Sequence, residues 1–334
     1  MTGKGFACNR YEDKCPYIWT VSKRFFFLFF FYSATSYCQD TIVLKRTAQP
    51  VVNYTSRKWL IGGVTLGGYG GSFLFLNTSW YKNYPRTSFH VFNDNGEWLQ
   101  MDKAGHAWTA YQTSRLTTSF WQWAGVKNEK ALLYGTGSSL LYLLSIEYLD
   151  GHSSEWGWSW GDAGADVFGA ALYASQALGW KEQRIAVKFS SHYKIYKEED
   201  LKVRADNLFG KSFQSRLLKD YNAQTYWLSA NLKSFFPLSA LPSWLNVSVG
   251  YGADGMFGGF DNRGYNKTTG QLIFDRRDIK RYRQFYLAPD VDFTKIKTKS
   301  KLLKATFSAL NVLKFPAPAL EFAKGKLRLK AIAF

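Results

Sequence analysis

Acidic residues and a single histidine recur at helical spacings in the middle of the chain. They form three pairs whose members stand three or four residues apart, namely Asp102 and His106, Glu147 and Asp150, and Asp162 and Asp166. Side chains at these spacings lie on one face of a helix. If the helices pack as a bundle, the three faces can converge near the helix ends, as in the carboxylate and histidine metal sites of helical bundles.

Two kinds of catalytic chemistry fit these residue types. An oxygen-rich set with one imidazole suits a hard or borderline divalent cation, for which we expect Asp162 and Asp166 as ligands. The second kind is acid–base catalysis, with or without that metal. For it we expect four residues, namely His106 as the base with Asp102, Glu147 and Asp150.

A structural role for the same residues is an open alternative. Asp102 and Asp162 stand where acidic side chains cap helix N-termini, and a histidine beside an acid is often held by a structural hydrogen bond. Under each alternative the buried carboxylates need a partner, because an unpaired charge in a bundle interior is costly. We therefore expect His106 to lie within hydrogen-bond reach of at least one acid between positions 147 and 166.

Four stretches in the first half of the chain predict the helices that position these residues. Residues 102–124 and 129–150 indicate a helical hairpin, and residues 162–178 add a helix with a small-residue face. Residues 59–81 carry no charge and are rich in glycine. This stretch is long enough to cross a bilayer as a helix, although a buried helix or hairpin fits it equally well.

After position 180 the pattern of apolar residues changes to a period of two, which predicts strands. The alternation is clear in residues 185–189, 226–232 and 245–251, and further strands are expected near residues 283–287 and 326–334. The intervening residues 301–313 predict a helix. About six strands are fewer than the eight of the smallest single-chain outer-membrane barrels, so we do not expect a complete independent barrel.

The composition points to a membrane boundary. Aromatic residues make up 18% of the 334 residues, and the formal net charge is +18. Aromatic side chains are enriched where membranes meet water. From Lys295 to Phe334 there is a single acid, Glu321, and the basic side chains would attract nucleic acid or anionic lipid. Because we expect export, we predict salt-sensitive attraction to anionic membranes and no nucleic-acid partner.

The N-terminal region has the order of a secretory signal. A basic pair precedes the apolar run 25–32, and small and polar residues follow it. We expect residues 1–38 to be leader and signal peptide, with a mature chain that begins between Tyr37 and Gln39. Tyr37 stands where a lipoprotein signal needs a small residue, so we expect no lipid on Cys38. All three cysteines lie in this region, which leaves the mature chain without a disulfide framework or a thiolate metal site.

A set of polar and small residues is spread in a fixed order over residues 102–179. It consists of Asp102-Lys103-Ala104-Gly105-His106, Ala110-Tyr111, Ser114-Arg115, Glu147, Asp150-Gly151, Trp156-Gly157, Ser159, Gly161-Asp162 and Gly169. This set resembles the YfiM-like family of uncharacterised predicted periplasmic lipoproteins and, more faintly, VanZ-like membrane proteins. The resemblance implies an envelope location and a helical unit, and it supplies no reaction. Its other polar residues are those we expect to bind a ligand, namely Lys103, Tyr111, Ser114, Arg115 and Ser159.

These observations together predict an α+β protein of the bacterial cell envelope, at the outer membrane or the periplasmic face of a membrane. We expect a bundle of about four helices over residues 39–182 and a β-rich, basic, membrane-associated domain over residues 183–334. The first functional hypothesis is binding of a membrane lipid or lipid-linked glycan through the polar cluster. The alternatives are a metal-assisted or acid–base hydrolase of an envelope lipid, and a structural or assembly partner in an outer-membrane complex.

Overall fold

The computed structural model describes residues 54–79, 85–266 and 269–334 of the chain. The predicted signal peptide, its cleavage point and Cys38 lie outside the described residues. Val52–Phe334 form one unit, in which a helical half is followed by a sheet-rich half, so the α+β class is confirmed.

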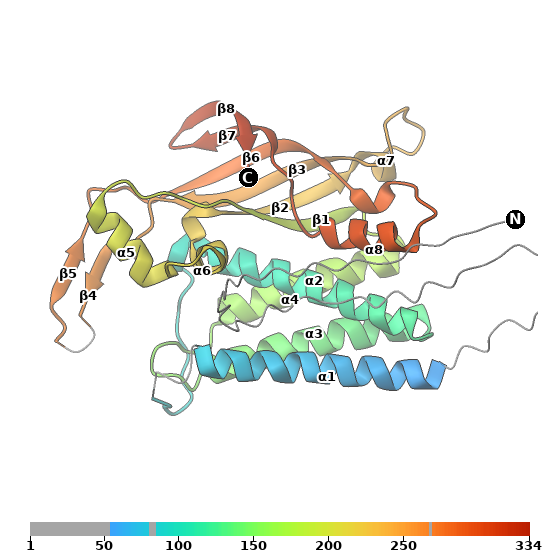
Figure 1. The fold of residues 1–334 in the computed structure, drawn as a ribbon, viewed down its shortest axis with the longest axis horizontal. Coiled ribbons are helices and arrows are strands. Elements are labelled where there is room, and N and C mark those ends of the chain that lie inside the picture. Colours follow the sequence, from blue (N-terminus) through green and yellow to red (C-terminus); the bar gives the residue numbers. More distant parts are fainter. Residues whose placement is uncertain (1–53, 80–84, 267–268) are drawn as a thin grey trace, which may run out of the picture. The chain divides into compact units, whose positions relative to one another are not determined.

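The helical half contains the four expected helices. These are α1 (Tyr54–Ser79), α2 (Met101–Trp123), α3 (Asn128–Asp150) and α4 (Trp160–Gly179), of which α2, α3 and α4 pack closely on one another (Figure 1). Glycines allow the close approach. A Cβ atom on Gly169 would lie 2.1 Å from the carbonyl oxygen of Ala107, and one on Gly135 would lie 2.1 Å from Oγ1 of Thr118. The backbones of α4 and α3 therefore rest directly against α2.

Helix α1 packs more loosely, on α2 and α3. The rings of Tyr69 and Tyr142 stack with their centroids 4.3 Å apart, and Oγ of Ser72 lies 2.6 Å from the Tyr142 hydroxyl. Among the described residues α1 is the one helix long and apolar enough to cross a membrane, judged by length and composition, and little of it is buried.

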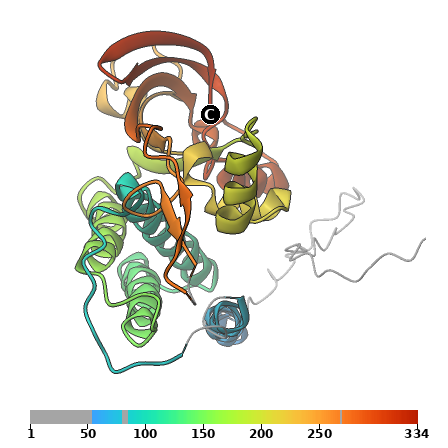
Figure 2. The same cartoon turned by 90° about the vertical axis from the view of Figure 1, so that its left-hand side faces the viewer.

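The second half is built on a six-stranded antiparallel sheet, which is strongly curled (Figure 2). Its strands, in spatial order, are β1 (Ile185–Ser191), β2 (Gln224–Asn231), β3 (Leu245–Asp254), β6 (Tyr282–Val291), β7 (Ala317–Ala323) and β8 (Lys326–Ala333). Residues 312–314 bond to the free edge of β1 through Phe189. A separate hairpin is formed by β4 (Arg263–Tyr265) and β5 (Leu272–Asp275).

Short helices connect and brace these strands. They are α5 (Glu199–Phe209), α6 (Phe213–Lys219), α7 (Leu232–Phe235) and α8 (Lys301–Leu310). Helix α8 falls within the expected residues 301–313, and Arg115 ties it to α2 by donating to Oγ of Ser308 at 2.9 Å. Helix α2 also contacts the sheet, where Tyr111 and Val187 share a hydrophobic core with Leu132 and Tyr173.

The residues that lead into α2 adopt an unusual backbone. Trp98, Leu99 and Gln100 have φ values of 45°, 52° and 65°, a left-handed conformation that costs roughly 1–2 kcal/mol for a residue with a Cβ atom. Contacts from the sheet half hold them in place. The Trp98 amide donates to the Gly259 carbonyl at 2.7 Å, and the Tyr251 hydroxyl donates to the Leu99 carbonyl.

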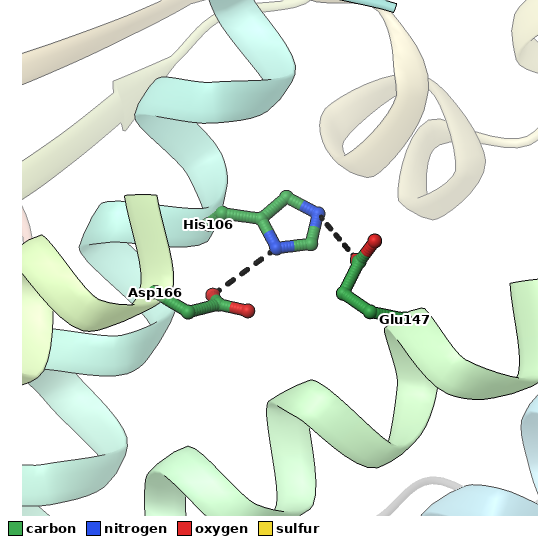
Figure 3. Close-up of side chains that lie close together, drawn as sticks. All are labelled: His106, Glu147 and Asp166. Atoms are coloured by element: carbon green, nitrogen blue, oxygen red, sulfur yellow. Dashed lines mark hydrogen bonds and ion pairs between the residues drawn. The ribbon is translucent and has the colours of Figure 1, made fainter. Parts of the chain in front are cut away.

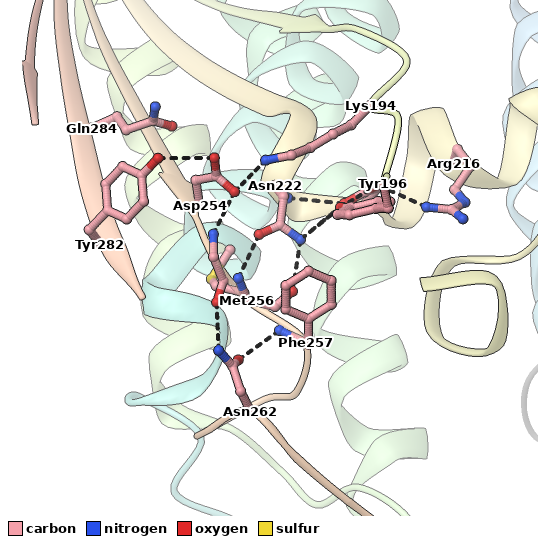
Figure 4. Close-up of polar contacts among 12 residues, drawn as sticks. Lys194, Tyr196, Arg216, Asn222, Asp254, Met256, Phe257, Asn262, Tyr282 and Gln284 are labelled. Carbon is pink, nitrogen blue, oxygen red and sulfur yellow. Dashed lines mark hydrogen bonds and ion pairs between the residues drawn. The ribbon is translucent and has the colours of Figure 1, made fainter. Parts of the chain in front are cut away.

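A network of buried amides fixes the turn that carries Gly259 (Figure 4). Asn222 exchanges two hydrogen bonds with the backbone of Met256, at 2.7 and 2.8 Å. Asn262 accepts from the Phe257 amide and donates to the Gly255 carbonyl, each at 2.8 Å. Met256 in turn packs on Met101, so this turn positions the N-terminal end of α2.

Candidate functional site

His106 lies at the centre of a cluster contributed by three helices (Figure 3). On one side of the ring, Nδ1 lies 3.1 Å from Oδ1 of Asp166 on α4, which confirms the expected contact with an acid. On the other side, Nε2 lies 3.8 Å from Oε1 of Glu147 on α3 and 3.8 Å from Oδ1 of Asp162 on α4. The imidazole side chain is 27% exposed, whereas Glu147 and Asp166 are buried.

Lys103 forms a second centre, one turn of α2 before His106. Its ammonium group lies 2.7 Å from Asp94, 2.8 Å from Asp102 and 3.1 Å from Asp162. Three carboxylates thus surround a single lysine. Because Asp162 faces both Lys103 and His106, it joins the two centres.

Ser159 sets the position of Asp162 through the backbone. It is the N-cap of α4, and its hydroxyl oxygen accepts from the Asp162 amide at 3.0 Å. The same hydroxyl donates to Oδ1 of Asp94 at 2.6 Å. Both bonds are buried, so Ser159 links the start of α4 to the loop before α2.

Three acids of the cluster, Glu147, Asp162 and Asp102, have raised pKa values. Burial raises the pKa of Glu147 to about 8, although the positive charge of His106 opposes the shift. Burial likewise raises the pKa of Asp162 to about 6 and raises the pKa of Asp102. Asp94 differs, because hydrogen bonds from Lys103 and Ser159 outweigh its burial and lower its pKa. The positive charges of Lys103 and His106 therefore do not balance all of these carboxylates.

The pKa of His106 is also raised, but here the shift favours the charged form of the side chain. Burial disfavours its charged form, but the hydrogen bond with Asp166 and the charges of Asp162 and Glu147 outweigh burial and raise its pKa to about 10. Without another cation, His106 is therefore a positively charged group held between carboxylates at neutral pH.

Within the part of the chain that the structure describes, two sets of ligand atoms lie close enough to hold a metal ion, and only one of these sets suits it. His106, Glu147 and Asp166 form the first set, and Asp94, Asp102 and Asp162 form the second. Lys103 already occupies the second set. In the first set, Oδ2 of Asp166 is buried without a hydrogen-bond partner among the described residues. One imidazole with carboxylates is a donor set that Zn²⁺ and Mn²⁺ accept.

Seven of the predicted site residues come together in this cluster. They are Asp102, Lys103, His106, Glu147, Ser159, Asp162 and Asp166. Asp150 ends α3, outside both sets of ligand atoms, although its charge helps to raise the pKa of Glu147. Tyr111, Ser114 and Arg115 lie further along α2. The ligand-binding roles expected for these three residues stay predictions.

Tyr111, Ser114 and Arg115 pack within the fold. The Tyr111 hydroxyl donates to Oε1 of Gln183 at 3.1 Å, next to the sheet. Arg115 donates from Nε to Oε1 of Gln112 at 2.9 Å, in addition to its contact with α8. Ser114 is fully buried, and its hydroxyl has no hydrogen-bond partner among the described residues.

Two acids of the site were not found from the sequence. Asp94 binds Lys103, and Glu97 lies close enough to the cluster that burial and the charges of Asp102 and Asp94 raise its pKa to about 7. Both precede α2 in an irregular segment, where no periodicity marks a face. The only signal available was their closeness in sequence to the Asp102-Lys103 pair.

Residues 90–176 match the model of a family described as predicted periplasmic lipoprotein (DUF2279). The match contains every member of the cluster, from Asp94 to Asp166. A search of curated proteins and a search of solved structures give no match to this chain. The family description supports an exported protein of the cell envelope, at the periplasmic face of a membrane, and it states no activity.

Proposed function

We propose that this envelope protein holds a divalent cation between α2, α3 and α4 and hydrolyses a lipid or lipid-linked substrate there. The observation that carries the proposal is the position of His106 between Asp166 on one ring nitrogen and Glu147 and Asp162 on the other. A carboxylate on Nδ1 orients an imidazole so that Nε2 can bind a metal, as in many histidine metal sites.

The chain's own residues supply the rest of the arrangement. Nε2 of His106 and an oxygen of Glu147 from the first set would hold the cation, and Asp162, which lies 3.8 Å from the same nitrogen, would add a third ligand. Asp166, the third member of the first set, lies on Nδ1 and would fix the ring. A divalent cation at such a site activates a water molecule for attack at neutral pH. Glu147 has a pKa of about 8 in the metal-free site, so the cation would have to displace its proton on binding. The partly exposed face of His106 leaves the site open to a substrate.

Metal binding by the purified full chain tests this proposal. After treatment with a chelator, we expect wild-type protein to bind one equivalent of Zn²⁺ or Mn²⁺ in isothermal titration calorimetry. His106→Ala should lose this binding. His90→Ala is the matched control, because His90 lies in the loop before α2 and is outside both sets of ligand atoms. Wild-type protein that binds neither metal would overturn the proposal.

A cavity favours the second candidate function, the binding of a lipid or lipid-linked glycan. It has a volume of about 650 Å³ and lies between α1 and the C-terminal end of α3. Phe73 and Leu74 line it from α1, Tyr148 and Leu149 from α3, and Arg86 from the loop between α1 and α2. Cavities of this size and apolar character suit small apolar ligands, and an arginine at the wall suits an anionic group.

Native mass spectrometry of the protein in a mild detergent tests this second candidate. Wild-type protein should retain a phospholipid, and Leu149→Arg should release it. Leu141→Arg is a control, because Leu141 is exposed on the same helix and does not line the cavity. The assembly role and the particular resemblances to YfiM-like and VanZ-like proteins stay predictions.

A further inference from the structure

The polarity of the curled sheet is inverted. In a water-soluble antiparallel sheet the apolar face packs in the core and the polar face meets water. Here the inner face carries the buried polar groups. Lys188, Asp290 and Ser229 are each at most 6% exposed, and they bond to one another across β1, β2 and β6, with Lys188 2.8 Å and Ser229 2.6 Å from Asp290.

Further polar contacts continue along this inner face. Asn246 donates to Oγ of Ser229 at 2.8 Å. The buried carboxylate of Glu321 on β7 accepts from Gln284 at 3.0 Å and from the Tyr286 hydroxyl at 3.1 Å. These polar groups of the inner face therefore find their hydrogen-bond partners within the sheet. They do not require water on the outer face.

The outer face carries an unbroken apolar row across five strands. Leu228 pairs with Val249, Val249 with Leu287, Leu287 with Leu320, and Leu320 with Leu329. Each of these side chains is between 40% and 77% exposed. Soluble proteins rarely leave contiguous apolar patches of this kind uncovered.

A second row runs parallel to the first. Phe285 pairs with Phe322, and Phe322 pairs with Leu327, and all three side chains are at least 45% exposed. Nearer the bundle this face is covered, since Tyr226 and Tyr251 contribute to the core around Met101. The exposed part lies over β2, β3, β6, β7 and β8, on the same face of the sheet that packs on α2 but beyond the residues that α2 covers.

We propose that this outer apolar face contacts the hydrocarbon of a lipid bilayer. Strands with apolar residues outward and polar residues inward are the pattern of membrane-embedded sheets. The 10 residues of β3 and of β6 also match the length of strands that cross a bilayer. Exposed aromatic residues stand at one end of these strands, with Trp244 before β3 and Phe236 after β2, as at membrane interfaces.

This contact differs from the attraction predicted for the basic residues of the C-terminal segment. Attraction between exposed charges and anionic lipid is screened by salt, whereas burial of leucine side chains in hydrocarbon is not. The proposed contact between the sheet and the bilayer also does not depend on the metal site. Because α1 is long and apolar enough to cross a membrane, flotation with vesicles would not distinguish the sheet from α1, and a local measurement is needed.

Single fluorophores on the sheet provide that measurement. The full chain, with its three cysteines changed to serine, receives Leu287→Cys, Leu320→Cys or Leu329→Cys, labelled with nitrobenzoxadiazole and reconstituted into phosphatidylcholine vesicles. Leu218→Cys, at an exposed leucine on α6, is the matched control. We expect a blue shift at the three sheet positions and quenching by lipids with doxyl-labelled acyl chains, unchanged at high salt, with neither effect at position 218.

Two outcomes would overturn the proposal. Sheet positions that acyl-chain quenchers affect no more than position 218 would show that the face lies outside the hydrocarbon. A blue shift that is present without lipid and resists these quenchers would show that a second copy of the chain covers the face. Zinc titration of the same labelled proteins keeps the result separate from the metal site, because metal binding should be equal in all four.

Discussion

Nε2 of His106 lies 3.8 Å from Oε1 of Glu147, whereas Nδ1 of the same ring lies 3.1 Å from Oδ1 of Asp166. The shorter distance is a direct hydrogen bond, and the longer one is not. A separation of 3.8 Å leaves room for an ion that both atoms coordinate at about 2.0–2.2 Å. In the proposed metal site the two sides of the ring would therefore have different roles, with Asp166 orienting the imidazole and Glu147 binding the ion together with Nε2.

The pH dependence of metal affinity follows from the protons that the ion must displace. Glu147, with a pKa of about 8, and His106, with a pKa of about 10, hold protons at neutral pH. Affinity should therefore rise with pH between 6 and 8, about tenfold per pH unit for each proton displaced. Calorimetry in buffers of different ionisation enthalpy counts these protons. A flat affinity over this range would contradict the assignment of Glu147 and His106 as ligands.

Glu147→Gln should stabilise the metal-free protein at alkaline pH. Burial raises the folded-state pKa of Glu147 from 4.5 to about 8. Between these values the unfolded chain is ionised and the folded chain keeps its proton, so stability falls as pH rises. His106 acts in the same direction, because its stabilising charge is complete below pH 6.5 and is lost as the pH rises through about 10.

The expected gain for Glu147→Gln is roughly 1–3 kcal/mol at pH 8 and close to zero at pH 4, measured by urea unfolding with a chelator present. Glu129→Gln, at the exposed start of α3, serves as the control and should show no such pH-dependent gain. Equal gains at both pH values would mean that burial of the Glu147 charge is not the cause.

Asp166→Asn should weaken metal binding about 10- to 100-fold, because the amide keeps the shape of the carboxylate but orients the imidazole less strongly. Asp166 is completely buried, so its replacement does not create a new surface. Asp150→Asn is the comparison, since Asp150 lies outside the sets of ligand atoms and should change the affinity much less. If the two variants behave alike, the contact between Asp166 and Nδ1 has no orienting role.

Lys188→Met should destabilise the sheet by about 3–5 kcal/mol, because it leaves the buried Asp290 carboxylate without its cation. Lys188 is fully buried and lies 2.8 Å from Oδ2 of Asp290. Adding Asp290→Asn in the same chain removes the unpaired charge and should recover much of the loss. Unfolding in detergent, monitored by tryptophan fluorescence, measures the stability of the single and the double variant. Trp227, which pairs with Lys188 on the same inner face, is one of the reporters. A double variant as unstable as the single one would argue against charge burial.

Gly169→Ala should weaken the contact between α4 and α2. Its new Cβ atom would lie 2.1 Å from the Ala107 carbonyl oxygen, a clash that requires the backbones to separate and costs roughly 1–3 kcal/mol. Gly164→Ala on the same helix meets nothing within 4 Å, and better helix propensity should stabilise it by up to about 1 kcal/mol. Thermal unfolding of the two variants should therefore shift in opposite directions.

The helices and their facing acids could be predicted because both depend on short spacings. The predicted hairpin ends at 124 and 150, and the helices end at Trp123 and Asp150. Strands β4, β5 and β7 and helices α5 and α6 were not predicted. In β7, Pro318 interrupts an already short alternation, and β4 spans only three residues.

The orientation of the sheet could not be predicted either. Alternation with period two marks two faces but does not say which face is buried. The sequence of β2 has Leu228 and Ser229 on opposite faces, and only the curl of the sheet shows that the serine is inside. Asp94 was missed for a related reason, since its contact with Lys103 depends on the path of an irregular loop.

The left-handed segment from Trp98 to Gln100 has a consequence for the order of folding. It is held by Tyr251 and Arg283, which follow it in the chain by 152 and 183 residues. Contacts across such long sequence separations form late, because closing the intervening loop costs entropy first. During folding the bundle can therefore assemble while Asp94, Asp102 and Lys103 still lack their final positions. The contacts of Lys103 with Asp94 and Asp102 are therefore completed only after β3 and β6 have formed, later than the packing of α2, α3 and α4 on one another.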